Sequence, residues 1–135
     1  MSPCTIVAMR LKNFKLSVGS QIFKACSEEP RLRILNLLMR NKEMTISDLE
    51  QVLDFTQTKT SRHVAYLKNT GTLTFRKQEQ WVLYSIKEEM TDILQQVLKY
   101  VEKDTILSTD QETYETLYSN RELSVNQLKQ KGGLS

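Results

Sequence analysis

The chain contains few of the residues from which many functional sites are built. Its 135 residues include 2 cysteines, 1 histidine, 4 glycines and 2 prolines. Cys4 and Cys26 are too few for a disulfide scaffold. With His63 as the single histidine, a zinc site of several imidazoles within one protomer is excluded. No apolar run approaches the roughly 20 residues of a membrane span, and residues 1–10 lack a long hydrophobic signal region. We therefore expect no membrane partner and a cytoplasmic location.

Patterns typical of enzymes are also missing. The sequence contains no glycine-rich phosphate loop, no Ser/His/Asp set and no metal-ligand spacing. Asp48 and Glu50 share one short predicted helix, where we interpret them as capping and solvated groups rather than as an acid–base pair. We expect neither catalysis nor a cofactor.

The charge that is present is unevenly distributed. Residues 1–87 carry 14 lysines and arginines against 7 acids, a net charge of +7, whereas residues 88–135 carry 5 against 9, a net charge of −4. Apolar residues make up 39% and charged residues 26%, which is a globular composition. A basic front part with an acidic rear part fits a protein that presents one face to a polyanion.

Apolar spacing predicts five helices in the first 102 residues. A Ser-Glu-Glu-Pro signal at residues 27–30 marks the start of the second, while Thr45 with Asp48 caps the third and Thr56 caps the fourth. Gly71 supplies the stop after the fourth helix. The predicted helices cover much of residues 5–26, a segment starting near residue 28, residues 46–53, residues 56–68, and about 90–101.

Two short segments between the fourth and fifth helices alternate like β-strands. Residues 73–77 and 81–86 predict an antiparallel hairpin, although its turn lacks the usual glycine. The fold class is therefore mainly α with a small β-hairpin, in the order helix, turn, helix, wing. We predict a winged helix-turn-helix domain for DNA binding and dimerisation over residues 1–102. Residues 103–135 would form a partly helical C-terminal extension, with segments near 110–118 and 125–129.

The fourth predicted helix has an unusual surface. From Thr56 to Arg76 the sequence contains no acid, and the helix offers lysine, arginine, histidine and small hydroxyl groups around a narrow apolar stripe at Val64 and Leu67. A basic helix surface is commonly a solvated face. Its position after a helix and turn and before a basic hairpin favours a nucleic-acid surface instead.

The first and fifth helices carry more apolar surface than a small domain needs. Because such faces would be exposed on a monomer, we expect a two-fold dimer built from these helices. The alternative is that both helices pack on their own domain. The predicted interface residues are Phe14, Val18, Ile22, Met90, Ile93, Leu94, Val97 and Val101.

Three blocks of sequence, residues 23–35, 61–68 and 81–84, resemble the ArsR/SmtB winged-helix transcriptional repressors in order and spacing. The resemblance covers roughly residues 18–102. It implies a homodimer that occupies a DNA operator and is released when an inducer binds.

The resemblance places the recognition helix on residues 57–68. Base-edge and phosphate contacts then correspond to Gln57, Thr58, Ser61, Arg62 and His63. Glutamine can bind adenine and arginine can bind guanine through two hydrogen bonds each. Two recognition helices about 34 Å apart would prefer a palindromic site in double-stranded DNA. Backbone contacts would come from Lys59, Lys68, Arg76, Lys77, Gln78 and Gln80.

The inducer is where the chain departs from the metal-sensing members. The Cys-x-Cys positions of those members hold Thr45 and Ser47 here, and the fifth helix has no imidazole. We therefore expect no metal site and a non-metal signal of unidentified kind. Cys4 and Cys26 leave two alternatives to simple packing: thiol sensing, or a thiolate site across the dimer. The C-terminal extension is a candidate for the signal site or for additional dimer packing.

These observations predict a sequence-specific DNA-binding transcriptional regulator that acts as a homodimeric repressor. The alternative is a winged-helix module that binds proteins rather than an operator. The absence of acids between residues 56 and 76 argues against this alternative, because a protein-binding surface has no need of that charge bias.

Overall fold

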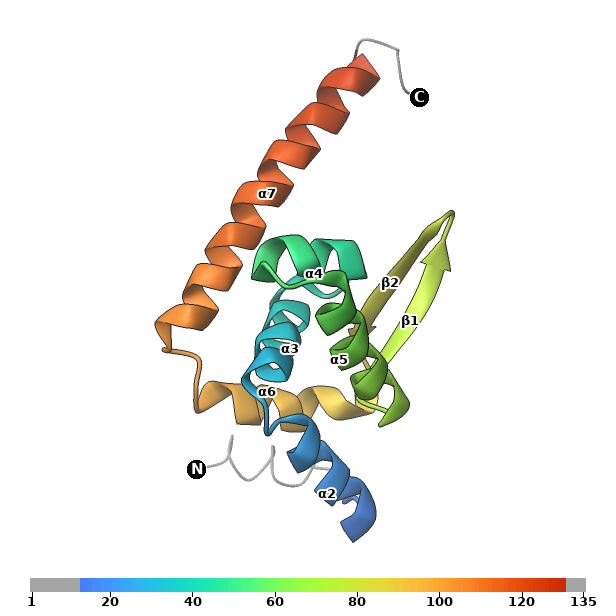
Figure 1. Cartoon of the computed structure of the whole chain (residues 1–135), viewed down its shortest axis with the longest axis vertical. Coiled ribbons are helices and arrows are strands. Elements are labelled where there is room, and N and C mark those ends of the chain that lie inside the picture. Colours follow the sequence, from blue (N-terminus) through green and yellow to red (C-terminus); the bar gives the residue numbers. More distant parts are fainter. Residues whose placement is uncertain (1–12, 131–135) are drawn as a thin grey trace, which may run out of the picture.

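The computed structural model describes the backbone of residues 13–130 and the side chains of residues 13–118. The predicted fold class is confirmed, because helices account for most of the chain and a two-stranded antiparallel hairpin follows the helix-turn-helix (Figure 1). In chain order the elements are α2 (Leu16–Ala25), α3 (Glu29–Asn41), α4 (Ile46–Leu53), α5 (Gln57–Asn69), β1 (Leu73–Gln78), β2 (Trp81–Ile86), the 3-10 helix η1 (Glu88–Met90), α6 (Thr91–Lys99) and α7 (Thr105–Gln130).

The hydrophobic core lies where α3, α4, α5 and α6 meet. Leu35, Leu49, Leu67 and Leu94 come one from each helix, and each is fully buried. The hairpin projects from one side of this core, while α2 and α6 lie together at one end (Figure 1). The core therefore holds α5 with one face inward and one face available.

The start of the first helix differs from the prediction. Helix α2 begins only at Leu16, because Lys15 has an extended backbone with φ −59° and ψ 151° and forms the N-cap. The non-helical residues 13–15 include Asn13, a residue type with low helix propensity. Residues 5–12 of the predicted helix lie outside the described residues.

The other predicted helix starts are confirmed. Helix α3 has Pro30 in its first turn. Helix α4 has the complete capping box, in which Asp48 N donates to Thr45 Oγ1 at 3.0 Å and Thr45 N donates to the Asp48 carboxylate at 3.1 Å. The capping box satisfies backbone groups that the start of α4 would otherwise leave without partners.

The hairpin has a regular register and one additional attachment to the helices. Leu73 pairs with Ile86 at its base and Gln78 pairs with Trp81 at its tip, where Glu79 takes the positive φ of 57° in place of glycine. An isolated bridge joins Met44 to Tyr84, with N–O distances of 3.1 and 2.8 Å. This bridge ties the wing to the chain just before α4 and was not predicted from the sequence.

The C-terminal part is more continuous than predicted. Helix α7 runs unbroken through both segments for which separate helices were expected. It crosses α3 and α4 and then continues beyond them (Figure 1). The division into a domain of residues 1–102 and an extension of residues 103–135 remains a prediction.

Candidate nucleic-acid interface

Helices α4 and α5 form the helix-turn-helix. The turn is three residues long because Asp54 adopts a left-handed conformation, φ 57° and ψ 42°, and ends α4. Thr56 then starts α5, and its hydroxyl accepts a hydrogen bond from Lys59 N at 3.1 Å. Local sequence thus sets the direction in which α5 leaves the turn.

Helix α5 has one buried and one exposed face. Thr60, Val64 and Leu67 are buried against the core. The opposite face carries no acid. Its exposed residues are Gln57, Thr58, Arg62, Ala65, Lys68 and Asn69, and Lys59 and Ser61 lie half-buried at its margin.

The structure corrects the predicted contact set at His63. This side chain lies on the inner side of α5 with an exposed fraction of 4%, so it is not part of the exposed face. Burial lowers the pKa of the imidazole, and the neighbouring Arg62, Arg31 and Lys59 lower it further, while Glu28 acts in the opposite direction. The neutral imidazole is therefore favoured.

Two lysines of α5 lie over aromatic rings. Lys59 Nζ is 4.0 Å from the centroid of Phe55, and Lys68 Nζ is 5.0 Å from the centroid of Phe75 on β1. The Phe75 ring in turn lies 5.9 Å from Tyr84 on β2. These contacts hold two cationic groups near the exposed face, and helical periodicity alone could not predict either pairing.

The wing offers fewer free cations than predicted. Lys77, Gln78 and Gln80 are exposed on the hairpin. Arg76, by contrast, binds Glu43 through two hydrogen bonds, with its Nε and Nη2 at 2.6 and 2.8 Å from the carboxylate oxygens. This ion pair lowers the pKa of Glu43. No local pattern indicated the pairing, because the partners are 33 residues apart.

The predicted dimer residues separate into two groups. Ile22, Met90 and Leu94 are buried in the core of their own protomer, with exposed fractions of 2%, 6% and 0%, which removes them from any exposed surface. The half-buried members are Phe14, Val18, Ile93, Val97 and Val101. Periodicity could not separate these groups, because both have helical spacing.

Three large apolar side chains on or near the same two helices are strongly exposed and were missing from that prediction. Leu16 is 90% exposed, Phe23 65% and Tyr100 91%. Leu16 and Phe23 lie on α2, and Tyr100 directly follows α6. They add apolar surface at the end of the molecule where α2 and α6 lie (Figure 1).

The remaining candidate sites show no metal-binding arrangement. Burial raises the pKa of the Cys26 thiol against the effect of Arg31, which reduces its thiolate fraction, and Cys4 lies outside the described residues. Among the side chains that the structure describes, no three of the His, Cys, Asp and Glu type are placed to hold a metal ion. Thr45 is the N-cap of α4, and Ser47 is exposed.

Within the described part of the chain, no helix has both the length and the apolar character needed to cross a bilayer.

The C-terminal tyrosines form a small aromatic cluster. The rings of Tyr114 and Tyr118 are stacked with centroids 4.2 Å apart. Tyr118 also borders an open hollow of about 630 Å³, which is lined on its other sides by Ser47 of α4 and Trp81 of β2. Helix α7 and the wing thus face one another across this hollow.

Comparison with known proteins decides the family. The model of bacterial regulatory proteins of the arsR family matches residues 28–73, which include α3, α4 and α5. The "Arsenic resistance transcriptional regulator ArsR2" of Pseudomonas putida is 35% identical over 78 residues, covering 58% of this chain and 68% of the relative. This chain belongs to the arsR family.

Other relatives of this arsR-family protein match over a shorter share of their length. The "Arsenical resistance operon repressor" of Escherichia coli K12 is 44% identical over 66 residues, which cover 49% of this chain and 56% of the relative. The "Arsenic resistance transcriptional regulator ArsR1" of P. putida is 34% identical over 80 residues, or 59% of this chain and 62% of the relative. The chain therefore spans less than two thirds of these two proteins.

Solved structures agree on the fold of this arsR-family protein. HlyU from Vibrio cholerae superposes with a TM-score of 0.57 and 28% identity, covering 62% of this chain and 91% of HlyU. Mb0332 from Mycobacterium bovis, described as a homodimeric winged helix-turn-helix DNA-binding domain, has a TM-score of 0.58 at 23% identity, with coverages of 67% and 83%. These likenesses confirm the winged helix-turn-helix.

Proposed function

We propose that this arsR-family chain is a sequence-specific DNA-binding transcriptional regulator that acts as a homodimeric repressor. The observation that carries the proposal is the acid-free exposed face of α5, held outward by the helix-turn-helix and flanked by a wing with Lys77. An α-helix fits the major groove of B-DNA, where base edges are exposed. Relatives with regulator and repressor names support this role.

The exposed residues of α5 divide by chemistry. Gln57 and Arg62 can each form two hydrogen bonds with a base, and Thr58 and Ser61 offer short donors and acceptors. Backbone phosphates would be bound by Lys59, Lys68, Lys77, Gln78 and Gln80. His63 has no place in this set because it is buried, and Arg76 contributes only if its bond to Glu43 opens.

A dimer follows from the exposed apolar groups of α2 and α6. Leu16, Phe23 and Tyr100 would be covered by a second copy of the chain, together with the half-buried Val18 and Val97. Two α5 helices related by a two-fold axis would read a palindromic operator with half-sites about 34 Å apart. The role is one of binding without catalysis, in the cytoplasm, with release by a non-metal signal.

Selection of bound sequences from a random duplex pool tests the proposal. The expected result is an enriched palindrome with half-sites one helical turn apart. Arg62→Ala should relax the preference at one position of each half-site and cost about 1–3 kcal/mol, whereas Lys77→Ala should weaken all sequences alike. If no duplex is enriched even at low salt, DNA binding is refuted and a protein-binding role becomes the better account.

Sedimentation of the purified protein tests the dimer independently. We expect a dimer that dissociates when Phe23→Lys and Tyr100→Lys are combined, because two exposed apolar groups become charged. Lys103→Ala, in the turn between α6 and α7, is the control and should leave the dimer intact. A monomer in the unaltered protein would contradict this part of the proposal.

A further inference from the structure

The junction of α2 and α3 forms a second basic region beside α5. An open hollow of about 560 Å³ lies between this junction and α5, with Lys24 and Ser27 on one side and Arg62 and Tyr66 on the other. The sequence analysis assigned no DNA-binding role to Lys24, Ser27 or Arg31. Because Arg62 borders both this hollow and the exposed face of α5, the two surfaces are continuous.

Arg31 fixes the shape of the hollow. Its side chain is only 7% exposed, and its Nε and Nη2 donate to the carbonyl oxygens of Ala25 and Lys24 at 2.9 and 2.8 Å. The guanidinium also lies 4.2 Å from the centroid of the Tyr66 ring on α5. These bonds satisfy carbonyl groups at the end of α2 and hold the backbone of Lys24 in place relative to α5.

The hollow carries excess positive charge. Glu28 is its single acid among the described lining residues, and Glu28 already pairs with Arg31 at 3.3 Å. Within the described part of the chain, neither Lys24 nor Arg62 forms an ion pair. This excess positive charge contributes to the lowered pKa of the adjacent His63, because Arg62 and Arg31 oppose protonation of the imidazole. Two cations of the hollow are therefore available to an anion.

We infer that this hollow binds a backbone phosphate of the DNA duplex that α5 reads, with Lys24 as its charged ligand and Arg62 at its border adding positive charge. The inference rests on the proposed function and extends it to a surface outside the helix-turn-helix and wing. Helix α5 lies between the hairpin and the α2–α3 junction (Figure 1). A helix in the major groove has a phosphate strand on each side, so the wing binds one strand and the hollow binds the other.

The salt dependence of DNA binding tests the inference. Each phosphate contact adds about 0.9 to the slope of log affinity against log salt. Lys24→Ala should therefore lower the slope by about 1 for each protomer bound, and Lys24→Glu should weaken binding further by repelling the phosphate. Lys103→Ala removes the same charge from the connection between α6 and α7, away from α5, and should leave the slope unchanged.

The outcomes separate this inference from the proposed function. If the unaltered protein binds its selected duplex and Lys24→Ala has the same slope, the hollow does not hold a phosphate and the inference is wrong. If the unaltered protein binds no duplex, the proposed function fails and the inference fails with it. Lys24 is exposed, so its variants should keep the thermal midpoint of the unaltered protein.

A titration with inorganic phosphate distinguishes DNA from a free anion. His63 is the only histidine in the chain, so its imidazole proton signal reports on the hollow without ambiguity. The duplex should raise the pKa of His63 in the unaltered protein, and less so in Lys24→Ala, because a phosphate offsets the nearby cations. A saturable shift with millimolar inorganic phosphate, without any shift on addition of the duplex, would assign the hollow to a small anion and overturn the inference.

Discussion

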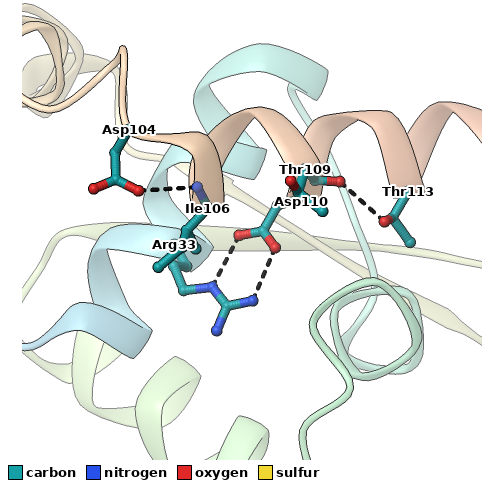
Figure 2. A network of polar contacts seen from close by, with 6 residues as sticks. All are labelled: Arg33, Asp104, Ile106, Thr109, Asp110 and Thr113. Carbon is teal, nitrogen blue, oxygen red and sulfur yellow. Dashed lines mark hydrogen bonds and ion pairs between the residues drawn. The ribbon is translucent and has the colours of Figure 1, made fainter.

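Arg33 in α3 and Asp110 in α7 form an ion pair with two parallel hydrogen bonds. Arg33 Nε donates to Asp110 Oδ2 at 2.9 Å and Nη2 donates to Oδ1 at 2.8 Å (Figure 2). The Asp110 side chain is 5% exposed, so the pair lies largely away from solvent. It raises the pKa of Arg33 and attaches the C-terminal helix to the centre of the domain.

The same arginine reaches the helix-turn-helix. Its guanidinium carbon lies 5.2 Å from the centroid of Phe55 in the turn, and Lys59 of α5 lies 4.0 Å from that same centroid. At the next position of α7, Gln111 exchanges two hydrogen bonds with Asn41, at 2.8 and 2.9 Å. Helix α7 is therefore connected through side chains to the start of the proposed recognition helix.

Asp110→Asn should destabilise the protein. Loss of the carboxylate leaves the Arg33 cation without this partner, and we expect the free energy of unfolding to fall by about 1–3 kcal/mol. Urea denaturation at a fixed protein concentration measures this free energy of unfolding. Glu112→Gln removes the same charge from an exposed position of α7 and should change the stability little. Equal stability of the two variants would show that the ion pair contributes nothing net.

Glu43→Gln should strengthen DNA binding. Glu43 holds Arg76 through two hydrogen bonds, and a phosphate must compete with this carboxylate for the guanidinium. Release of Arg76 would add one phosphate contact per protomer, so the salt slope should increase by about 1 for each protomer. Arg76→Ala combined with Glu43→Gln is the control and should remove the gain. An unchanged slope in Glu43→Gln alone would place Arg76 outside the interface.

His63 should make the protein less stable in mild acid. Its folded-state pKa lies below the ordinary value of 6.5, so the unfolded chain binds more protons between these two values. The stabilisation is fully present above about pH 6.5 and is lost as the pH falls toward the folded-state pKa.

Urea denaturation between about pH 5 and about pH 7 measures the effect of His63. Glu43 does not interfere, because its pKa is lowered from 4.5 and its contribution is lost only in stronger acid. His63→Gln should flatten the pH dependence over this range. An equally steep dependence in that variant would refute the assignment.

Gly19 and Gly71 should respond to alanine in opposite directions. Gly71 has the positive φ of 79°, which L-residues adopt at a cost of about 1–2 kcal/mol, so Gly71→Ala should lower stability. The N–H groups of Gly71 and Thr72 donate to carbonyl groups in the last turn of α5 and so end the helix. Gly19 lies inside α2 with no atom within 4 Å of the position that a Cβ would take, so Gly19→Ala should raise stability by about 0.5–1 kcal/mol. The midpoint of thermal unfolding measures the stability of both alanine variants. A lower midpoint for Gly19→Ala would show that α2 needs glycine for another reason.

Much of the fold was predictable because it depends on short stretches of sequence. Residues 46–53 were predicted as a helix with the bounds observed, since the Thr45 and Asp48 capping pair and the apolar spacing are both local features of this segment. The strand of residues 81–86 was also predicted with its observed bounds. Residues 13–15 were predicted to be helical because apolar spacing continued across them, but they lie outside α2.

The candidate interface was predictable only in part. The sequence shows that residues 56–76 contain no acid, but the resemblance counted His63 among the DNA contacts, whereas the packing of α5 against the core buries it. Arg31 and Lys24 were not recognised because their relation to Arg62 requires α2, α3 and α5 to be placed in space.

The amino-acid sequence by itself determined the starts of helices α3, α4 and α5, the presence of the hairpin, and the positive charge of the proposed recognition helix α5. Helix-start signals, periodicity and charge are properties of neighbouring residues. Tertiary structure decided which cations remain free. Arg76 and Arg33 are neutralised by Glu43 and Asp110, 33 and 77 residues away, while Lys24 and Arg62 have no such partner among the described residues. Pairings across such separations depend on how the helices pack, and local sequence carries no record of them.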